Sequence, residues 1–187
     1  VLLHGYREWN TGLMDKLNGM WAFAIFDKRE EKLFFSRDRF GQKPLFYSFN
    51  RDTFAFASEL RAFCCHSKIT HNLSKRGLQK YCAYGYFPGD YTAYEGVYKL
   101  PAGCYLSVSI KDIKPNVQRY WSYRIEPEEG ESKEIEEKWV ACVQDLLEKS
   151  VKRRLISDVP LGIFLSGGLD SASIAFFANR YVTQGQL

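Results

Sequence analysis

Ser166-Gly167-Gly168-Leu169-Asp170-Ser171 connects two apolar segments near the end of this 187-residue chain. The segment before it, Gly162 to Leu165, is short and partly β-branched, which favours a β-strand. The segment after it, Ala172 to Val182, repeats apolar residues three and four positions apart, which favours a helix. The sequence therefore predicts a strand, a tight glycine loop and a helix in succession.

A loop of this composition suits an anionic ligand. Adjacent glycines let the main chain approach a ligand closely, and successive N–H groups at a helix N-terminus present positive partial charge to it. Ser166 and Ser171 can donate hydroxyl hydrogen bonds to phosphate oxygens, whereas Asp170 can only accept them or hold a cation. Because Mg²⁺ typically takes one or two carboxylates together with substrate phosphates, these residues predict a magnesium ion between Asp170 and a pyrophosphate group. The competing interpretation is a glycine turn whose Asp or Ser merely caps the next helix.

The absence of one phosphate-binding motif indicates which bond of the nucleotide is cleaved. The sequence has no Gly-x-x-x-x-Gly-Lys-Ser/Thr, the lysine-dependent loop of enzymes that transfer a γ-phosphate. We therefore expect ATP as the cosubstrate, with cleavage between its α and β phosphates.

The same loop resembles the signature of the ATP-pyrophosphatase (PP-loop) superfamily, and residues 158–165 in front of it look like those of glutamine-hydrolysing asparagine synthetases. Three upstream blocks are similar to the amidotransferase domain of that family: Leu17–Asp27, Arg37–Tyr47 and Ala57–Ala62. The blocks occur in the order that the family has, so the resemblance covers essentially the whole chain.

The resemblance implies a fold for each part of the chain. Residues 1–126 would be the C-terminal part of an α+β N-terminal-nucleophile sandwich, with antiparallel sheets and helices. Residues 127–187 would be a linker and the first strand, loop and helix of an α/β PP-loop domain built on a parallel sheet. The domain boundary is expected between about Glu126 and Ser132.

The resemblance also implies an activity for a longer parent enzyme, an asparagine synthase that uses ATP, aspartate and glutamine. Glutamine is hydrolysed to ammonia, the aspartate side chain is joined to AMP with release of pyrophosphate, and ammonia displaces the AMP. The residues that would bind ATP and pyrophosphate, with Asp170 also holding Mg²⁺, are Leu165, Ser166, Gly167, Gly168, Asp170 and Ser171.

Other parts of that machinery are not found. The family's glutaminase uses an N-terminal cysteine, and none of the five cysteines here is N-terminal, so no glutaminase catalytic residue is assigned. Arg37 and Asp38 are interpreted either as a salt bridge that braces the turn before Gly41 or as a substrate contact. The chain begins at Val1 without an initiator Met and ends one helix after the loop, so we expect a piece of a larger enzyme, inactive by itself and with a poorly ordered loop.

Secondary structure is predicted along the rest of the chain. Four aromatic-rich strands are expected at Trp21–Asp27, Leu33–Asp38, Pro44–Phe49 and Thr53–Ser58, and further strand character at Tyr98–Ile110. The apolar run Met20–Phe26 predicts a strand covered on both faces. Short helices are expected at Glu59–Cys65 and Lys75–Tyr84. A glutamate-rich segment from Glu126 precedes a longer helix, which Ser132 can cap and which ends before Pro160, with an apolar stripe interpreted as core at Ile135, Trp139, Val143, Leu146 or Leu147, and Val151.

Composition and charge restrict the class of protein. The hydrophobic content of 45% is enough for a buried core. The net charge is +4, but the basic residues are spread widely and do not alternate with aromatic residues along one face, which argues against nucleic-acid binding. No stretch predicts a membrane span or a signal peptide. An odd number of cysteines without paired spacing favours a reducing compartment, so we expect a cytoplasmic location, and Cys64-Cys65-His66 lacks a second ligand pair for zinc.

Two other functions remain open. A relative of the β-lactam-synthetase kind, or another PP-loop amide-forming ligase, would adenylate a different carboxylate. A non-catalytic nucleotide-binding module would retain the loop without turnover, although the intact Ser166, Asp170 and Ser171 argue against such decay. The acceptor acid and the oligomeric state stay open, with a homodimer of the parent as one option.

Overall fold

The computed structural model describes residues 1–127 and 133–182. The chain divides into two compact units, Val1–Arg124 and Ile125–Leu187. None of the described helices is both long enough and apolar enough to cross a lipid bilayer.

The first unit contains two antiparallel sheets. One has the strand order β1-β2-β6-β7 and the other the order β4-β3-β5. The strands are β1 Ala22–Asp27, β2 Lys32–Arg37, β3 Phe46–Phe49, β4 Phe54–Ala57, β5 Val97–Lys99, β6 Cys104–Ser109 and β7 Asn116–Arg119. The predicted antiparallel sheet is thus confirmed, and the four aromatic-rich strands begin and end within two residues of the predicted limits.

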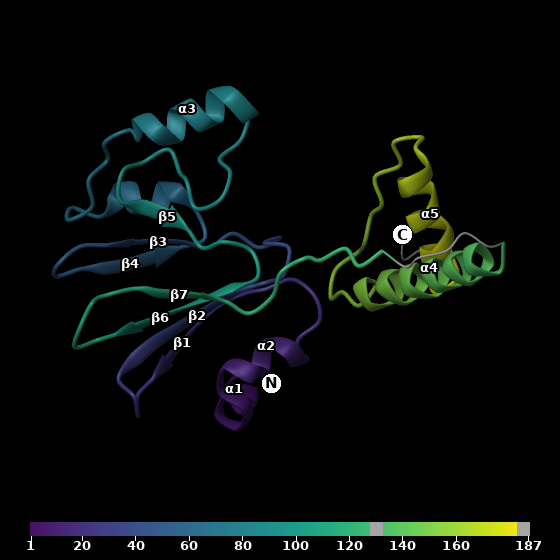
Figure 1. Cartoon of the computed structure of the whole chain (residues 1–187), viewed down its shortest axis with the longest axis horizontal. Coiled ribbons are helices and arrows are strands. Elements are labelled where there is room, and N and C mark those ends of the chain that lie inside the picture. Colours follow the sequence, from purple (N-terminus) through teal and green to yellow (C-terminus); the bar gives the residue numbers. More distant parts are fainter. Residues whose placement is uncertain (128–132, 183–187) are drawn as a thin grey trace. The chain divides into compact units, whose positions relative to one another are not determined.

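Helices cover the outer face of each sheet (Figure 1). The helices α1 Leu2–Trp9 and α2 Leu13–Lys16, joined by the 3-10 turn η1 Asn10–Gly12, lie against the first sheet. The 3-10 helix η2 Leu60–Cys65 lies against the second sheet, with α3 Lys75–Tyr84 beyond it. The first unit is therefore layered as helix, sheet, sheet and helix, and the predicted helix at Lys75–Tyr84 is confirmed.

Strand β2 shows how the sequence builds these layers. Successive side chains of a strand point to opposite faces of the sheet. Phe34 accordingly packs with Tyr6, Leu13 and Met14 on the helix side, whereas Phe35 lies between the two sheets. The core between the sheets comprises Phe35, Leu45, Tyr47, Leu100, Cys104, Leu106 and Val108.

The prediction that the run Met20–Phe26 is covered on both faces is wrong for the described structure. Its strand β1 pairs with β2 alone and lies at the edge of its sheet. Met20 and Phe26 are 47% and 50% exposed, respectively. Strand β2 is covered on both faces, because Phe34 packs against the helix layer and Phe35 packs between the two sheets.

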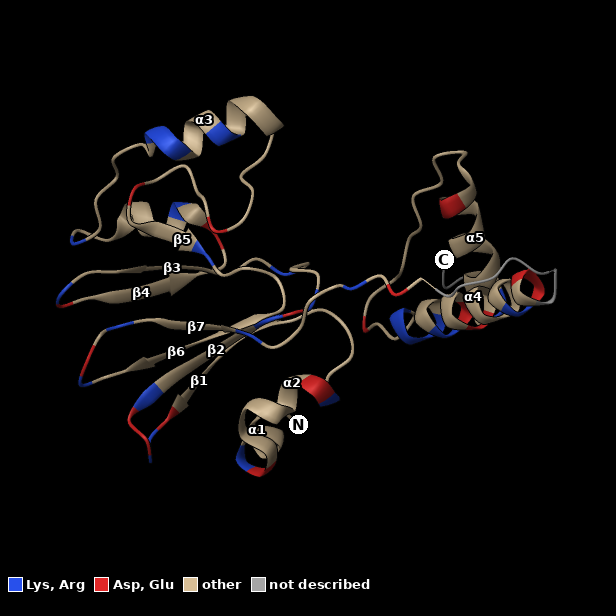
Figure 2. Ribbon diagram, viewed as in Figure 1, with Lys and Arg blue, Asp and Glu red and all other residues tan. Residues whose placement is uncertain are grey.

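The second unit contains two helices, α4 Lys133–Arg154 and α5 Leu169–Asn179. Their contact buries Val151, Phe177 and Ala178, with Leu147, Leu155 and Ile163 packed around them. Lys152, Arg153 and Arg154 occupy the last turn of α4, where cations complement the helix dipole (Figure 2).

Three predictions for this unit need comment. Residues 162–165 form no strand, because a strand exists through hydrogen bonds to a neighbour and the described part of this unit offers none. The stripe on α4 joins the core toward its C-terminal end: Val151 is buried and Leu147 packs beside it, whereas Trp139, Val143 and Leu146 are about half exposed. The predicted capping residue Ser132 lies outside the described residues.

Candidate functional site

The loop 166–171 has the backbone that its glycines allow. Gly167 has a φ of 79°, in the left-handed region that favours glycine, and no atom beyond its two chain neighbours lies within 4 Å of the position that a Cβ would take there. Gly168 is the N-cap of α5, with φ −86° and ψ 160°. The helix begins at Leu169, so Asp170 and Ser171 lie in its first turn.

The first turn of α5 leaves main-chain donors available. The first N–H groups of a helix have no partner within the helix, and the N-cap Gly168 has no side chain to accept from them. No other side chain caps this end in the described structure. These amides and the dipole of the 11-residue helix therefore favour an anion at this position.

The two serines of the loop bond to each other. Their Oγ atoms lie 3.1 Å apart, and the main-chain N–H of Ser166 donates to Ser171 Oγ at 3.3 Å. The hydroxyl of Ser171 also donates to the main-chain oxygen of Gly168 at 3.1 Å. The structure thus brings together Ser166, Gly168 and Ser171, as the sequence predicts for a shared site. The hydrogen bonds among these residues were not predicted from the sequence.

The remaining predicted residues lie beside the loop and are exposed. Asp170 projects from the first turn of α5 without a hydrogen bond or ion pair to any described residue. Leu165 and its neighbour Phe164 are 67% and 99% exposed. An unpartnered carboxylate next to free amides fits a magnesium pyrophosphate, since phosphate oxygens and waters can complete the coordination of the ion.

No all-protein metal site competes with this arrangement. The described residues contain no group of three or more His, Cys, Asp or Glu side chains that could hold a metal ion. All five cysteines are free thiols, and the hydrogen-bond partners of His66 and His71 are main-chain groups, those of Lys68 and Phe63. A magnesium ion would need the ligand's phosphates, with Asp170 as the protein contribution.

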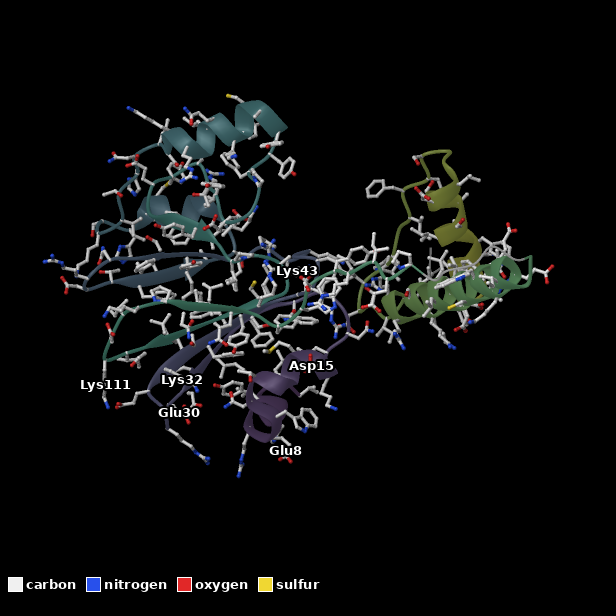
Figure 3. The ribbon with its side chains drawn as sticks, in the orientation of Figure 1. Glu8, Asp15, Glu30, Lys32, Lys43 and Lys111 are labelled. Carbon is white, nitrogen blue, oxygen red and sulfur yellow. The ribbon has the colours of Figure 1, made fainter. Side chains whose placement is uncertain are left out.

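Arg37 and Asp38 brace a turn of the first unit. The guanidinium donates to the main-chain oxygens of Lys43, Leu100 and Gly41 at 2.7, 2.6 and 2.5 Å. Lys43, labelled in Figure 3, belongs to this turn, and its main-chain oxygen is one of the three acceptors of Arg37. Burial lowers the pKa of Arg37, and Asp38 partly offsets that shift.

The carboxylate of Asp38 stabilises the same turn by accepting hydrogen bonds from its main chain. It accepts hydrogen bonds from the main-chain N–H groups of Phe40, Gln42 and Lys43 at 3.0 to 3.1 Å, and it is 1% exposed. The structure records no ion pair between Arg37 and Asp38 among the described residues. Both side chains are thus committed to the turn, which supports the bracing interpretation through main-chain bonds instead of a salt bridge.

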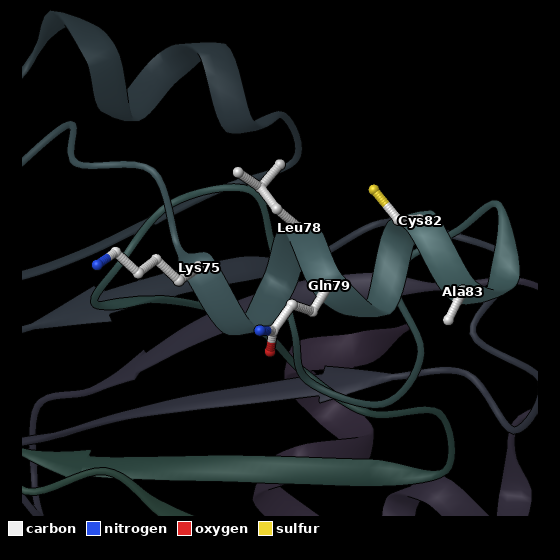
Figure 4. A pocket seen from close by; sticks show the side chains of 5 residues that line it. All are labelled: Lys75, Leu78, Gln79, Cys82 and Ala83. Carbon is white, nitrogen blue, oxygen red and sulfur yellow. The ribbon is translucent and has the colours of Figure 1, made fainter.

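Two hollows of the surface do not coincide with the loop. A hollow of about 370 Å³ lies between α4, α5 and residues 161–163, and its lining is mostly apolar. An open hollow of about 660 Å³ runs along α3 and is lined by Lys75, Leu78, Gln79, Cys82 and Ala83 (Figure 4). The second lining offers one thiol without a base beside it, so the loop remains the candidate site.

Comparisons with known proteins match different family models to the two parts of the chain. Residues 1–121 match the family model described as glutamine amidotransferase domain, and residues 142–186 match the model described as asparagine synthase. The chain is 36% identical to asparagine synthetase [glutamine-hydrolyzing] 3 of Bacillus subtilis, with 100% of this chain and 30% of that protein covered. It is also 36% identical to a putative asparagine synthetase [glutamine-hydrolyzing] 2 of Methanocaldococcus jannaschii, covering 100% of this chain and 36% of that protein. The chain thus spans about a third of the length of these relatives.

Proposed function

The chain belongs to the glutamine amidotransferase domain family, and we propose that it is part of a glutamine-hydrolysing asparagine synthetase. Residues 1–126 are then the C-terminal part of the amidotransferase domain, and residues 127–187 are a linker and the start of a PP-loop synthetase domain. In the longer protein, residues 162–165 form a strand of a parallel sheet, with the loop at its carboxyl end. The match of residues 142–186 to the asparagine synthase model supports this assignment.

The observation that carries the proposal is the group of main-chain amides and polar side chains at the start of α5. The unpaired amides that follow Gly168, the exposed Asp170 and the hydroxyl of Ser166 all belong to the six-residue segment 166–171. Such a group fits the β and γ phosphates of ATP, because amides and hydroxyls donate hydrogen bonds to their oxygens. Magnesium, when bound, offsets the charge that develops on the departing pyrophosphate.

The proposed reaction makes a poor electrophile reactive. A carboxylate repels nucleophiles, so the side chain of aspartate first attacks the α-phosphate of ATP, and pyrophosphate departs. Ammonia from glutamine then attacks the carbonyl carbon, and AMP leaves with the former carboxylate oxygen. The loop holds the triphosphate in position for the first step and stabilises the leaving pyrophosphate through its amides. Leu165, at the start of the loop, packs near the nucleotide.

We place the enzyme in a reducing compartment such as the cytoplasm, because all five cysteines are free and four of them are exposed. Its partners are the small molecules ATP, aspartate and glutamine, and the longer protein is a candidate homodimer. The 187-residue chain alone is expected to make no asparagine.

The test uses the longer protein that contains this sequence. Pyrophosphate release from ATP should depend on aspartate, and either glutamine or ammonium should support asparagine formation. Asp170→Asn should reduce pyrophosphate release at least 100-fold, because the magnesium-bound phosphates lose their carboxylate. Asp145→Asn, at an exposed acid paired with Lys149 on α4, is the matched control and should leave the rate unchanged.

Specific outcomes would contradict the proposal. Pyrophosphate release that needs another carboxylic acid in place of aspartate would indicate a different amide-forming ligase. Binding of ATP without any turnover in the longer protein would indicate a nucleotide-binding module.

A further inference from the structure

We infer that Ser171 is the positioning residue of the loop: its hydroxyl holds Ser166 and Gly168 together and remains inside the loop, while the phosphate is held by the main-chain amides and by Ser166. This inference rests on the proposed function for its ligand, but the bonding itself is a property of the ligand-free chain. It changes the role that the sequence predicts for Ser171, which is direct contact with phosphate.

The hydrogen-bonding capacity of Ser171 is fully used. A serine hydroxyl has one proton to donate and two lone pairs with which to accept. Ser171 donates its proton to the main-chain oxygen of Gly168 at 3.1 Å and accepts from the main-chain N–H of Ser166 at 3.3 Å. The Oγ of Ser166, at 3.1 Å, takes the remaining lone pair. A phosphate oxygen needs a donor, and Ser171 has none to offer while these bonds persist.

Ser166 is bound less completely. Its hydroxyl has Ser171 Oγ as its one partner among the described residues, so it can turn toward a phosphate oxygen after a single hydrogen bond breaks. Its main-chain N–H would still donate to Ser171. The two serines of the motif therefore have different roles, although they look equivalent in the sequence.

Little else holds the loop in shape. Residues 166–170 are exposed. Around Gly167, no residue other than its chain neighbours comes within 4 Å of the position that a Cβ would take. The bonds of Ser171 connect the residue before Gly167 with the residue after it. Gly168 also accepts from the main-chain N–H of Ala172, so the loop is tied to the first turn of α5. Without the Ser171 hydroxyl, we expect the backbone at Gly167 to sample other conformations, since glycine restricts φ so little.

The first experiment needs no ligand. Backbone ¹⁵N order parameters of residues 166–169 are measured without ligand in the longer protein that contains this sequence, in its Ser171→Ala variant and in its Ser171→Thr variant. We expect values of about 0.8 in the wild type and in Ser171→Thr, which keeps the hydroxyl, and values below about 0.6 in Ser171→Ala. Ser173→Ala is the control, because its hydroxyl donates to Leu169 inside the helix and not to the loop. Unchanged order parameters in Ser171→Ala would overturn the inference.

The second experiment measures the dissociation constant of magnesium pyrophosphate by calorimetry. Ser171→Ala should weaken binding about tenfold through lost order, with Ser171→Thr restoring it, while Ser166→Ala should weaken binding about fivefold without any change in order parameters. Loss of order in α5 itself, at Ala175 and Phe177, would show that Ser171 serves only the helix and would also overturn the inference. A wild-type chain that binds neither magnesium pyrophosphate nor MgATP would argue against the proposed function, and the order parameters alone would then decide the role of Ser171.

Discussion

The guanidinium Nη1 of Arg37 donates a hydrogen bond of 2.6 Å to the main-chain oxygen of Leu100, 63 positions along the chain. Arg37 ends β2 in the first sheet, and Leu100 directly follows β5 in the second. The same guanidinium donates to the turn at Gly41 and Lys43. One buried side chain therefore connects both sheets and the turn between them.

Arg37→Lys is expected to destabilise the chain by about 2 to 4 kcal/mol, because an ammonium cannot reach three carbonyl oxygens that a planar guanidinium reaches together. The free energy of unfolding from urea titration checks this value. Arg29→Lys, at an exposed arginine in the turn between β1 and β2, is the matched control and should change stability by less than about 0.5 kcal/mol. Equal effects of the two substitutions would refute the bracing role of Arg37.

Gly41→Ala should be more destabilising than Gly89→Ala. Both glycines have a positive φ, 65° and 61°, so both variants bear a similar backbone strain of about 1 to 2 kcal/mol. A Cβ at Gly41 would also lie 2.9 Å from Cζ of Arg37, whereas nothing lies within 4 Å at Gly89. The difference in unfolding free energy between the variants measures the crowding by Arg37 and by the Cβ of Ala102, 3.1 Å away, and a difference of zero would show that both can move aside.

Gly77→Ala tests the attachment of α3. A Cβ at Gly77 would collide with the main-chain oxygen of Thr92, while at Gly12 the nearest atom is 3.8 Å away. Neither glycine has a positive φ, so Gly12→Ala is a control for the change in composition alone. We expect Gly77→Ala to lower stability by about 1 to 3 kcal/mol and to increase hydrogen exchange in α3, with Gly12→Ala near neutral. Normal exchange in α3 of Gly77→Ala would contradict this close approach.

The stability of the first unit should decrease in alkaline solution. Burial, with smaller effects from Asp90, Tyr98 and Cys104, raises the pKa of Tyr47 to about 12. The folded chain thus keeps a proton that the unfolded chain releases near pH 10, so this stabilisation is complete below pH 10 and is lost as the pH rises to 12. Burial lowers the pKa of Lys99, which acts with the opposite sign, so variants must be compared at each pH.

Tyr47→Phe isolates this effect. The gap in urea midpoint between the variant and the wild type should move in favour of the variant between pH 10 and pH 11.5 and stay constant below pH 9.5. Tyr123→Phe, at an exposed tyrosine, is the control. A gap that does not change with pH would mean that Tyr47 is not protected from ionisation.

The positions of most strands could be predicted from local residue patterns. Alternating aromatic and small residues in Phe54–Ala57, and the turn residues around them, are visible within a few positions of the chain. Helices α1 and α2 and the strand β7 were not predicted. In β7, all four residues are exposed, so its sequence carries no alternation of buried and exposed side chains, and it is a strand because it pairs with β6.

The residues of the candidate site were predicted from the sequence, but the hydrogen bonds among them were not. The order of glycines, serines and Asp170 indicates an anion-binding loop, because each residue type has a fixed hydrogen-bonding capacity and backbone freedom. The hydrogen bond between Ser171 and Ser166 depends on the rotamers of both side chains and on the backbone conformation at Gly167. These are set by the folded loop and cannot be read from residue types.

The sequence by itself determined the antiparallel strands, the glycine loop before α5 and the resemblance to a glutamine-dependent synthetase, since these depend on residue identity and local periodicity. Only the tertiary structure decided that β1 is an edge strand, that Arg37 reaches Leu100, and that Ser171 bonds within its own loop. The physical reason is that pairing and burial depend on which segments meet in space. The two partners of such a contact can lie far apart in the chain, and the local sequence around one residue does not identify the other.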